Sequence, residues 1–315
     1  MDALSRTLAL YPARSALDVR CQLGAPWVLR HEAEAPGVAP YHLIVSGTAW
    51  LERSGADSIE LRAGDIVLLP RGCAHRLRAG DADADGAGGT PPLRINVGAR
   101  GLQWKRNDGD GAVADILCGK FEFEHGAANP VLMALPEVLL VRTAGRADFT
   151  SLQALMAMLR SETERQQPGA NVLMAHLSSA LFALLMRVWL EQSTPASGLF
   201  ALLGERRLLP AVQAMLAAPE QAWALNDLAR LCHMSRASFV RLFNHVAGTT
   251  PATVLLHTRM AQAAVWLARH ERSVRDIGEA VGYQSEAAFN RAFKRYFGVG
   301  PGLYRSSGGA YGQAQ

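Results

Sequence analysis

The sequence predicts an α+β protein with a β-barrel in its first half and helices in its second. The chain has 315 residues, about twice the usual length of one domain, so two domains are expected. Residues 1 to about 145 contain short β-prone runs, whereas residues 148–192 and the C-terminal third have helical patterns. The 49% of hydrophobic residues against 19% of charged residues suffices for packed cores and excludes wholesale disorder.

The β-prone runs of the N-terminal part are short and are separated by Gly, Pro and Asp. They cover residues 41–47, 48–52, 66–69, 94–97 and 116–123. Strands of this length and spacing suit a small barrel or jelly roll. The Gly-, Asp- and Ala-rich stretch 80–112 is expected to be a flexible insertion with one strand, and it lacks the spacing of an EF-hand calcium loop.

One motif of the N-terminal part resembles a known family. Residues Gly64 to His75 read G-x5-P-x-G-x2-H, which is similar to the second cupin motif, whereas the first motif is reduced to His42 ahead of Gly47. Cupin metal sites need three or four ligands, and only His42 and His75, with His31 as a further candidate, are available. We therefore predict no metal and no cofactor, with His42 and His75 as weak candidate ligands. Since no Ser/His/Asp or paired-carboxylate grouping stands out, the sequence predicts a sensor domain and no enzyme.

Two helices are predicted between the barrel and the C-terminal third. Asp148 is the expected cap of a run through Gln167, Pro168-Gly169 interrupts it, and a second run continues to Gln192. The leucine-rich side of the second run either forms the seam of a homodimer or packs on the barrel, and both alternatives stay open. Residues 192–198 (QSTPASG) are the best candidate for the interdomain linker.

The sequence also carries information on location. The most apolar stretch, residues 172–190, includes His176, Ser178, Ser179 and Arg187, so a buried helix is expected and no membrane span. The start of the chain lacks the apolar region of a secretory signal. We therefore expect a cytoplasmic protein.

An internal repeat organises the C-terminal third. Both copies share Ser-x-x-x-Phe-x-Arg-x-Phe, four residues and Gly-x-x-Pro, beginning at Ser235 and at Ser285. In each copy a short amphipathic helix precedes a turn, and the serine stands where the next helix needs its N-cap. This pattern predicts two helix-turn-helix units, at 225–246 and 274–297, joined by the Ala-rich helix 252–269. This rigid helix would hold the two recognition helices about one DNA turn apart, roughly 34 Å.

The second helix of each unit has an outward face opposite its phenylalanines. Because helical residues advance by about 100°, the arginine two residues after the first Phe points away from the core. The predicted DNA-contacting residues are Arg236, Ala237, Val240, Arg241 and Asn244 in the first unit and Glu286, Ala287, Asn290, Arg291 and Lys294 in the second. Arg reads guanine or binds phosphate, Asn reads adenine, and Val or Ala meets a thymine methyl. Whether the two central arginines contact bases or only phosphates stays open.

The charge distribution agrees with a polyanionic partner. Residues 206–305 contain 13 Lys and Arg against 6 Asp and Glu, whereas the rest of the chain contains 19 against 22. Residues 206–305, and above all 281–305, resemble the DNA-binding domain of the AraC/XylS family of bacterial transcription regulators. The resemblance implies binding to double-stranded promoter DNA and to RNA polymerase. From this resemblance together with the strand and helix patterns described above, we expect a cupin-like sensor domain over 1–145, a helical connector over 146–204, a DNA-binding domain over 205–306 and a disordered tail over 307–315.

The four cysteines form no CxxC pair. Cys232 is expected in a helical core, Cys73 in a barrel turn, Cys21 beside Arg20 in a loop, and Cys118 in a strand. The opening MDALSR, Cys21, the block 61–77, Cys118-Gly119 and the segment 234–239 together resemble the reactive-chlorine-responsive activators of the family. This resemblance implies that hypochlorous acid or a related oxidant oxidises Cys21 and Cys118, with a disulfide bond as a product, and so activates the regulator.

Three hypotheses about function follow. The first is a transcription activator of oxidative-stress genes, switched by cysteine oxidation. The second is a regulator of the same kind that responds to a small metabolite in the barrel. The third is a cupin enzyme fused to a DNA-binding module. Cys21 and Cys118 also fit a purely structural role as small buried side chains.

Overall fold

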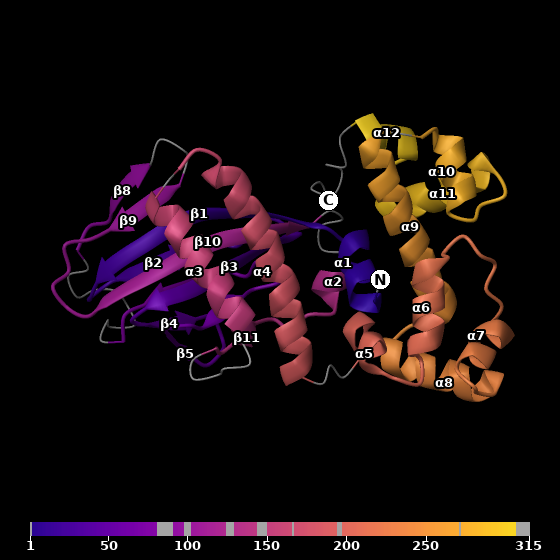
Figure 1. Ribbon diagram of the computed structural model, residues 1–315, viewed down its shortest axis with the longest axis horizontal. Coiled ribbons are helices and arrows are strands. Elements are labelled where there is room, and N and C mark those ends of the chain that lie inside the picture. Colours follow the sequence, from indigo (N-terminus) through magenta and orange to yellow (C-terminus); the bar gives the residue numbers. More distant parts are fainter. Residues whose placement is uncertain are drawn as a thin grey trace. The chain divides into compact units, whose positions relative to one another are not determined.

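The computed structural model describes residues 2–80, 91–97, 102–123, 129–143, 150–165, 167–193, 197–270 and 272–306. The chain divides into two compact units (Figure 1). The barrel unit consists of Ala13–Phe123 and Leu135–Glu191, and the helical unit consists of Met1–Pro12, Glu124–Ala134 and Gln192–Gln315.

The barrel unit contains two sheets. The larger sheet has the strand order β11-β6-β3-β10-β1-β9-β8, and the smaller one has the order β2-β7-β4-β5. The strands are β1 (Ala13–Gly24), β2 (Val28–His31), β3 (Val38–Ser46), β4 (Thr48–Glu52), β5 (Ile59–Arg62), β6 (Ile66–Leu68), β7 (His75–Arg78), β8 (Arg94–Val97), β9 (Gln103–Arg106), β10 (Val113–Phe123) and β11 (Leu139–Val141).

The core of the barrel unit lies between its two sheets. Leu23 and Ile116 from the larger sheet and Leu51 and Leu77 from the smaller one belong to a single buried cluster. Because side chains alternate along a strand, every second residue of β1 and β10 points into this core. The neighbouring residues point to the other face of the larger sheet.

That other face is covered by helices α3 (Thr150–Arg165) and α4 (Ala170–Gln192) (Figure 1). The Tyr41 hydroxyl lies 3.3 Å from the Ser178 hydroxyl, and the Phe121 and Phe182 rings lie 5.1 Å apart. The two predicted helices therefore pack on the barrel, and their use as a dimer seam stays a prediction. Among the described residues, α4 is the helix whose length and apolar composition would suit a membrane span, and its buried face packs on the sheet here.

The helical unit is built from ten helices in the described residues. These are α1 (Ala3–Leu10), α2 (Pro130–Met133), α5 (Leu199–Gly204), α6 (Leu209–Ala217), α7 (Leu225–Leu231), α8 (Arg236–Ala247), α9 (Pro251–Arg269), α10 (Val274–Ala280), α11 (Glu286–Phe297) and α12 (Pro301–Ser306). Helix α9 contacts members of both repeated helix pairs, so it joins them into one body (Figure 1).

Two N-terminal segments belong to the helical unit, although the sequence suggested a barrel domain over 1–145. Helix α1 buries Ala3, Thr7 and Leu10 and contacts α6 and α9, and α2 contacts α5. Both are short helices with buried apolar residues, and these residues pack against the helices of this unit. Local sequence patterns did not predict that these two helices belong to the helical unit, because this depends on tertiary contacts.

The predicted α+β class, with a β-rich first half and two helix-turn-helix units, is confirmed. The sequence missed several strands, among them β1 and β9, and β9 adds a second strand to the insertion expected at 80–112. Residues 81–90 and 98–101 of that insertion, the cap Asp148, residues 194–196 of the linker and the tail 307–315 lie outside the described residues.

Candidate functional site

The first helix-turn-helix unit consists of α7 and α8. The Ser235 hydroxyl caps α8 by accepting a hydrogen bond of 3.2 Å from the Ser238 N–H, as predicted. In the turn, His233 takes a positive φ of 53°, and the Met234 N–H donates to the Ala229 carbonyl at 2.9 Å. Helix α8 ends at Gly248 in the left-handed region.

The second unit, α10 and α11, repeats these contacts. Ser285 accepts from the Ala288 N–H at 3.2 Å, and the Tyr283 N–H donates to the Gly278 carbonyl at 2.9 Å. The turn residue is Gly282, with a φ of 91°, where a Cβ atom would lie 2.4 Å from the Glu220 carbonyl oxygen. Only glycine satisfies both the conformation and the space at this position.

Buried phenylalanines fix which side of each recognition helix faces outward. Phe239 and Phe243 of α8 and Phe289 and Phe293 of α11 are all fully buried. Their rings pack in pairs, with centroids 5.6 Å apart in α8 and 5.5 Å apart in α11. The opposite side of each helix is largely exposed and can contact a ligand.

The ten predicted DNA-contacting residues lie on this opposite side or at its border. Eight are exposed, namely Arg236, Ala237, Arg241, Asn244, Glu286, Ala287, Arg291 and Lys294. Val240 and Asn290 are half-buried. Val240 and Asn244 line an apolar pocket of about 520 Å³ beside α9 and Tyr283. Which of these residues contact bases and which contact phosphates stays a prediction.

Arg259 of α9 is a positioning residue that the sequence did not reveal. Its guanidinium donates to the carbonyls of Pro219 at 2.6 Å and Gln221 at 3.0 Å, and it lies 6.0 Å from the centre of the Tyr283 ring. It thus ties the turn before the first unit to the turn of the second. An arginine within an Ala-rich helix has no sequence signal for this role.

In the barrel unit, Cys21 and Cys118 lie on neighbouring strands. Cys21 of β1 is opposite Ile116 of β10, and Cys118 is two residues further along β10, on the same face. Both thiols are buried, with 1% and 6% of the residue exposed. The prediction that Cys21 sits in a loop is wrong, because the segment pairs with β10 on one side and β9 on the other.

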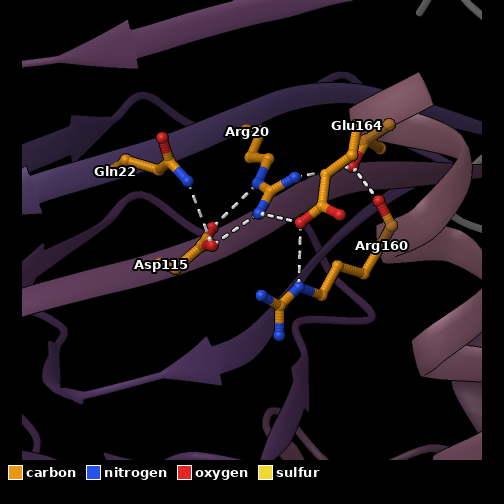
Figure 2. A network of polar contacts seen from close by, with 6 residues as sticks. Arg20, Gln22, Asp115, Arg160 and Glu164 are labelled. Carbon is orange, nitrogen blue, oxygen red and sulfur yellow. Dashed lines mark hydrogen bonds and ion pairs between the residues drawn. The ribbon is translucent and has the colours of Figure 1, made fainter. Parts of the chain in front are cut away.

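Arg20 also differs from its predicted role as a cation beside Cys21. It points to the opposite face of β1, where its guanidinium binds the Asp115 carboxylate at 2.7 and 3.0 Å and the Glu164 carboxylate at 3.0 Å (Figure 2). Its Nη1 atom also donates to the Thr163 hydroxyl of α3 at 3.1 Å. Arg20 and Asp115 are both buried, so this network anchors α3 to the sheet.

A chain of hydrogen bonds connects Cys118 to two histidines. The Nδ1 atom of His75 donates to the Cys73 carbonyl at 2.8 Å, because a carbonyl only accepts. Neutral His75 then accepts at Nε2 from the Nε2–H of His42, 2.7 Å away, which leaves Nδ1 of His42 as an acceptor. That atom lies 3.1 Å from the Cys118 sulfur and accepts a hydrogen bond from its thiol.

Burial keeps the histidines of this cluster neutral. It lowers the pKa of His31 to about 4, with the neighbouring His75 acting in the same direction. It lowers the pKa of His42 well below its usual value, and it lowers that of His75 against the opposing effect of the hydrogen bond to Cys73. All three side chains therefore offer lone pairs at neutral pH.

The other two cysteines lie elsewhere. Cys232 is buried beside α7, as the sequence predicted, and burial raises the pKa of its thiol. Cys73 is half-buried in the turn that precedes β7. The sequence named His31 as a further candidate beside His42 and His75, but it did not indicate the contact of His42 with Cys118, because these two residues come from separate strands.

Comparison with known proteins agrees with both units. A profile of the cupin family matches residues 2–191, and a profile of the helix-turn-helix domain matches residues 228–307. The RCS-specific HTH-type transcriptional activator RclR of Escherichia coli K12 is 34% identical over 306 residues, which cover 97% of each chain. The HTH-type transcriptional regulator MtrA of Neisseria gonorrhoeae is 31% identical over 313 residues, covering 98% of this chain and 99% of its own. A putative AraC-like transcription regulator of Streptomyces lividans is 32% identical over 308 residues, covering 97% and 98%.

These similarities extend over nearly the whole chain, not only its repeated part. The relatives are transcription regulators and not enzymes. The duplicated helix-turn-helix units and their exposed arginines are the features that DNA binding requires. The chain belongs to the AraC family of DNA-binding transcription regulators, with a cupin domain in its N-terminal part.

Proposed function

We propose that this regulator activates transcription in response to reactive chlorine species and that oxidation of Cys21 and Cys118 is the switch. The observation that carries the proposal is the placement of both thiols on one face of the paired strands β1 and β10, with His42 beside Cys118. The relative RclR, which bears the description RCS-specific activator, supports the same signal.

The register sets how the two thiols approach each other. Diagonal neighbours on one face of an antiparallel pair have Cα atoms about 7–8 Å apart. A disulfide needs Cα atoms roughly 4.4–6.8 Å apart. Cys21 and Cys118 are such diagonal neighbours, so bonding them pulls β1 along β10. Oxidation therefore changes the backbone and not only the two side chains.

The chemistry needs only the oxidant, water and the two thiols. The sulfur attacks the chlorine of hypochlorous acid and donates two electrons to it, so that an S–Cl bond forms, the Cl–O bond breaks, and the hydroxide leaves as water with the thiol proton. Water then displaces chloride from this sulfur, which gives a sulfenic acid and a proton. The second thiol attacks this sulfur, the S–S bond forms, and the hydroxyl leaves as water with the second thiol's proton. The Nδ1 atom of His42 lies 3.1 Å from the Cys118 sulfur and accepts a hydrogen bond from its thiol.

The Arg20 network carries the movement to the helices. Arg20 precedes Cys21, and Asp115 is three residues before Cys118, so a shift of β1 against β10 changes the geometry between these two charged groups. Glu164 of α3 binds the same guanidinium (Figure 2), and the Thr163 hydroxyl accepts a hydrogen bond from it. We propose that α3 moves with it and transmits the oxidised state.

We propose that the helical unit binds promoter DNA and contacts RNA polymerase, that two copies associate, and that the protein acts in the cytoplasm without catalytic activity. Met158, Val172 and Leu173 leave apolar surface exposed on α3 and α4, which supports the homodimer.

The decisive experiment treats the full-length protein with hypochlorous acid and maps its disulfides by peptide mass spectrometry, alongside reporter induction in cells. Cys21→Ser and Cys118→Ser are each expected to abolish induction and the cross-link while DNA binding stays measurable. Cys73→Ser is the matched control, since its thiol lies in the same unit but outside the strand pair, and it is expected to respond like the unmodified protein.

Two results would contradict the proposal. The first is full induction in Cys21→Ser, and the second is an oxidised protein in which Cys21 and Cys118 both remain reduced. Either would favour a small metabolite bound in the barrel as the signal.

A further inference from the structure

We propose that a cavity in the helical unit binds a small, uncharged and largely apolar molecule that carries one hydrogen-bonding group, such as an aliphatic alcohol. The cavity has a volume of about 390 Å³ and lies among α1, α2, α5, α6 and α9. This site is separate from the barrel unit, and the inference does not depend on the oxidant response. Its basis is the composition of the walls, a histidine without a partner and the position of the cavity beside both helix-turn-helix units.

Small side chains at the meeting points of the helices leave room for the cavity. Helix α1 contacts α6 and α9, and α2 contacts α5 (Figure 1). Ala134, Gly198 and Ala247 line the cavity at the end of α2, the start of α5 and the end of α8. The Gly198 N–H donates to the Val246 carbonyl at 2.8 Å, so the backbone holds the start of α5 against the end of α8. The volume falls within the range of roughly 300–1,000 Å³ that is typical of small-molecule sites.

The described walls of the cavity are apolar and uncharged. Their aliphatic side chains come from four helices and are Met133 of α2, Leu199 and Leu202 of α5, Val212 and Leu216 of α6 and Val254 of α9. The described residues that line the cavity include no Asp, Glu, Lys or Arg. An apolar ligand gains dispersion contacts with such walls and removes them from water. An ionised group would lose its hydration there without gaining a partner of opposite charge.

His257 of α9 supplies a hydrogen-bonding group for the ligand. Its side chain lines the cavity and is half-buried, and neither of its ring nitrogens has a hydrogen-bond partner among the described residues. Burial lowers the pKa of this histidine, so the ring is neutral at pH 7 and offers one donor and one acceptor. The hydroxyls of Thr7 and Thr258 instead donate to carbonyls of their own helices, at 2.9 and 3.0 Å. A hydroxyl group on the ligand can therefore pair with His257.

The cavity borders parts of both helix-turn-helix units. Ala247 is the last residue of α8, and Thr249, which also lines the cavity, follows shortly after it. The His257 ring packs edge to face on the Tyr296 ring of α11, with centroids 5.2 Å apart. Burial raises the pKa of Tyr296 to about 12 and also raises that of Tyr11, which lines the cavity, so neither phenol adds a charge. A molecule bound here contacts residues that support both recognition helices.

The uncharged walls decide between related ligands. 1-Octanol and octanoate have the same chain length and differ in the charge of the head group. Burying an unpaired carboxylate costs far more than burying a hydroxyl that is hydrogen-bonded. We therefore expect 1-octanol to bind at least about tenfold more tightly than octanoate at neutral pH.

The test titrates the full-length protein with 1-octanol and with octanoate by calorimetry. One molecule of 1-octanol per chain is expected. Val254→Phe and Ala134→Phe each place a ring in the cavity and should abolish this binding. His257→Phe keeps a ring beside Tyr296 but removes both nitrogens, and it should weaken 1-octanol binding about three- to tenfold, as expected for the loss of one hydrogen bond.

Leu303→Phe and His245→Phe are the matched controls, because both residues are exposed in the same unit and do not line the cavity. Both variants should bind 1-octanol as the unmodified protein does. Circular dichroism verifies the fold of each variant, and two filling variants keep the test valid if one of them does not fold. The inference is overturned if the protein binds no 1-octanol, if octanoate binds as tightly, or if folded Val254→Phe, Ala134→Phe and His257→Phe bind 1-octanol as tightly as the unmodified protein.

Discussion

The helix-turn-helix pair and the barrel bury different kinds of groups. The cores of the two helix pairs are formed by phenylalanines, and the polar residues of α8 and α11 stand outside, where DNA can reach them. The barrel instead encloses His42, His75 and Cys118, and it holds Arg20 against Asp115 on its covered outer face. One region therefore exposes polar side chains to a ligand on a rigid core, whereas the other buries side chains that can be ionised or oxidised.

The largest effect on stability is expected from breaking the ion pair of the barrel. Asp115→Ala leaves the Arg20 charge buried without its main partner and is expected to lower the free energy of unfolding by about 3–5 kcal/mol. Urea denaturation measures this loss. Glu60→Ala, which removes an exposed pair with Arg62, is the control and should change the stability little.

The same pair can be replaced as a unit. Arg20→Met combined with Asp115→Leu removes both charges and should recover most of the stability lost in Asp115→Ala. If this double variant also keeps DNA binding but loses the oxidant response, the network serves signal transmission. An unchanged oxidant response would assign it to stability alone.

An intermediate effect is expected in the turn of the second helix-turn-helix unit. Gly282→Ala adds left-handed strain and a clash with the Glu220 carbonyl, and we expect a loss of about 2 kcal/mol or more. Gly248→Ala has a similar φ of 65° but open space around the new Cβ atom, so its loss should be close to 1 kcal/mol. Thermal and urea unfolding compare the two, and equal losses would refute the close approach at Gly282.

The smallest effects are expected at the helix caps. Ser235→Ala and Ser285→Ala each remove one acceptor from the start of a recognition helix and should cost about 1 kcal/mol. Ser235→Asn keeps an acceptor and should retain the stability. A loss in Ser235→Asn as large as in Ser235→Ala would show that the cap is not the cause.

The same contrast explains what could be predicted from the sequence. The helix-turn-helix units rest on local features, namely helical periodicity, Ser235 and Ser285 as caps and Gly282 in a turn, so the repeat was enough to place them. The barrel cluster joins residues that are distant in the chain, such as His42 and Cys118, or Arg20 and Glu164. Their contacts depend on strand order and register, which a pattern of short β-prone runs does not specify. For this reason the prediction of a loop at Cys21 was wrong.

The central claim, that Arg241 and Arg291 are the paired DNA contacts, is tested most directly by the affinity of a variant that lacks both. Promoter DNA recovered with the regulator from cells is titrated in a gel shift at fixed salt. Arg62→Ala combined with Arg71→Ala, which removes two exposed arginines of the barrel unit, is the control for lost surface charge. Each lost contact is worth about 1–3 kcal/mol, so Arg241→Ala with Arg291→Ala should weaken binding about 30-fold or more. Unchanged affinity in that variant would contradict the account.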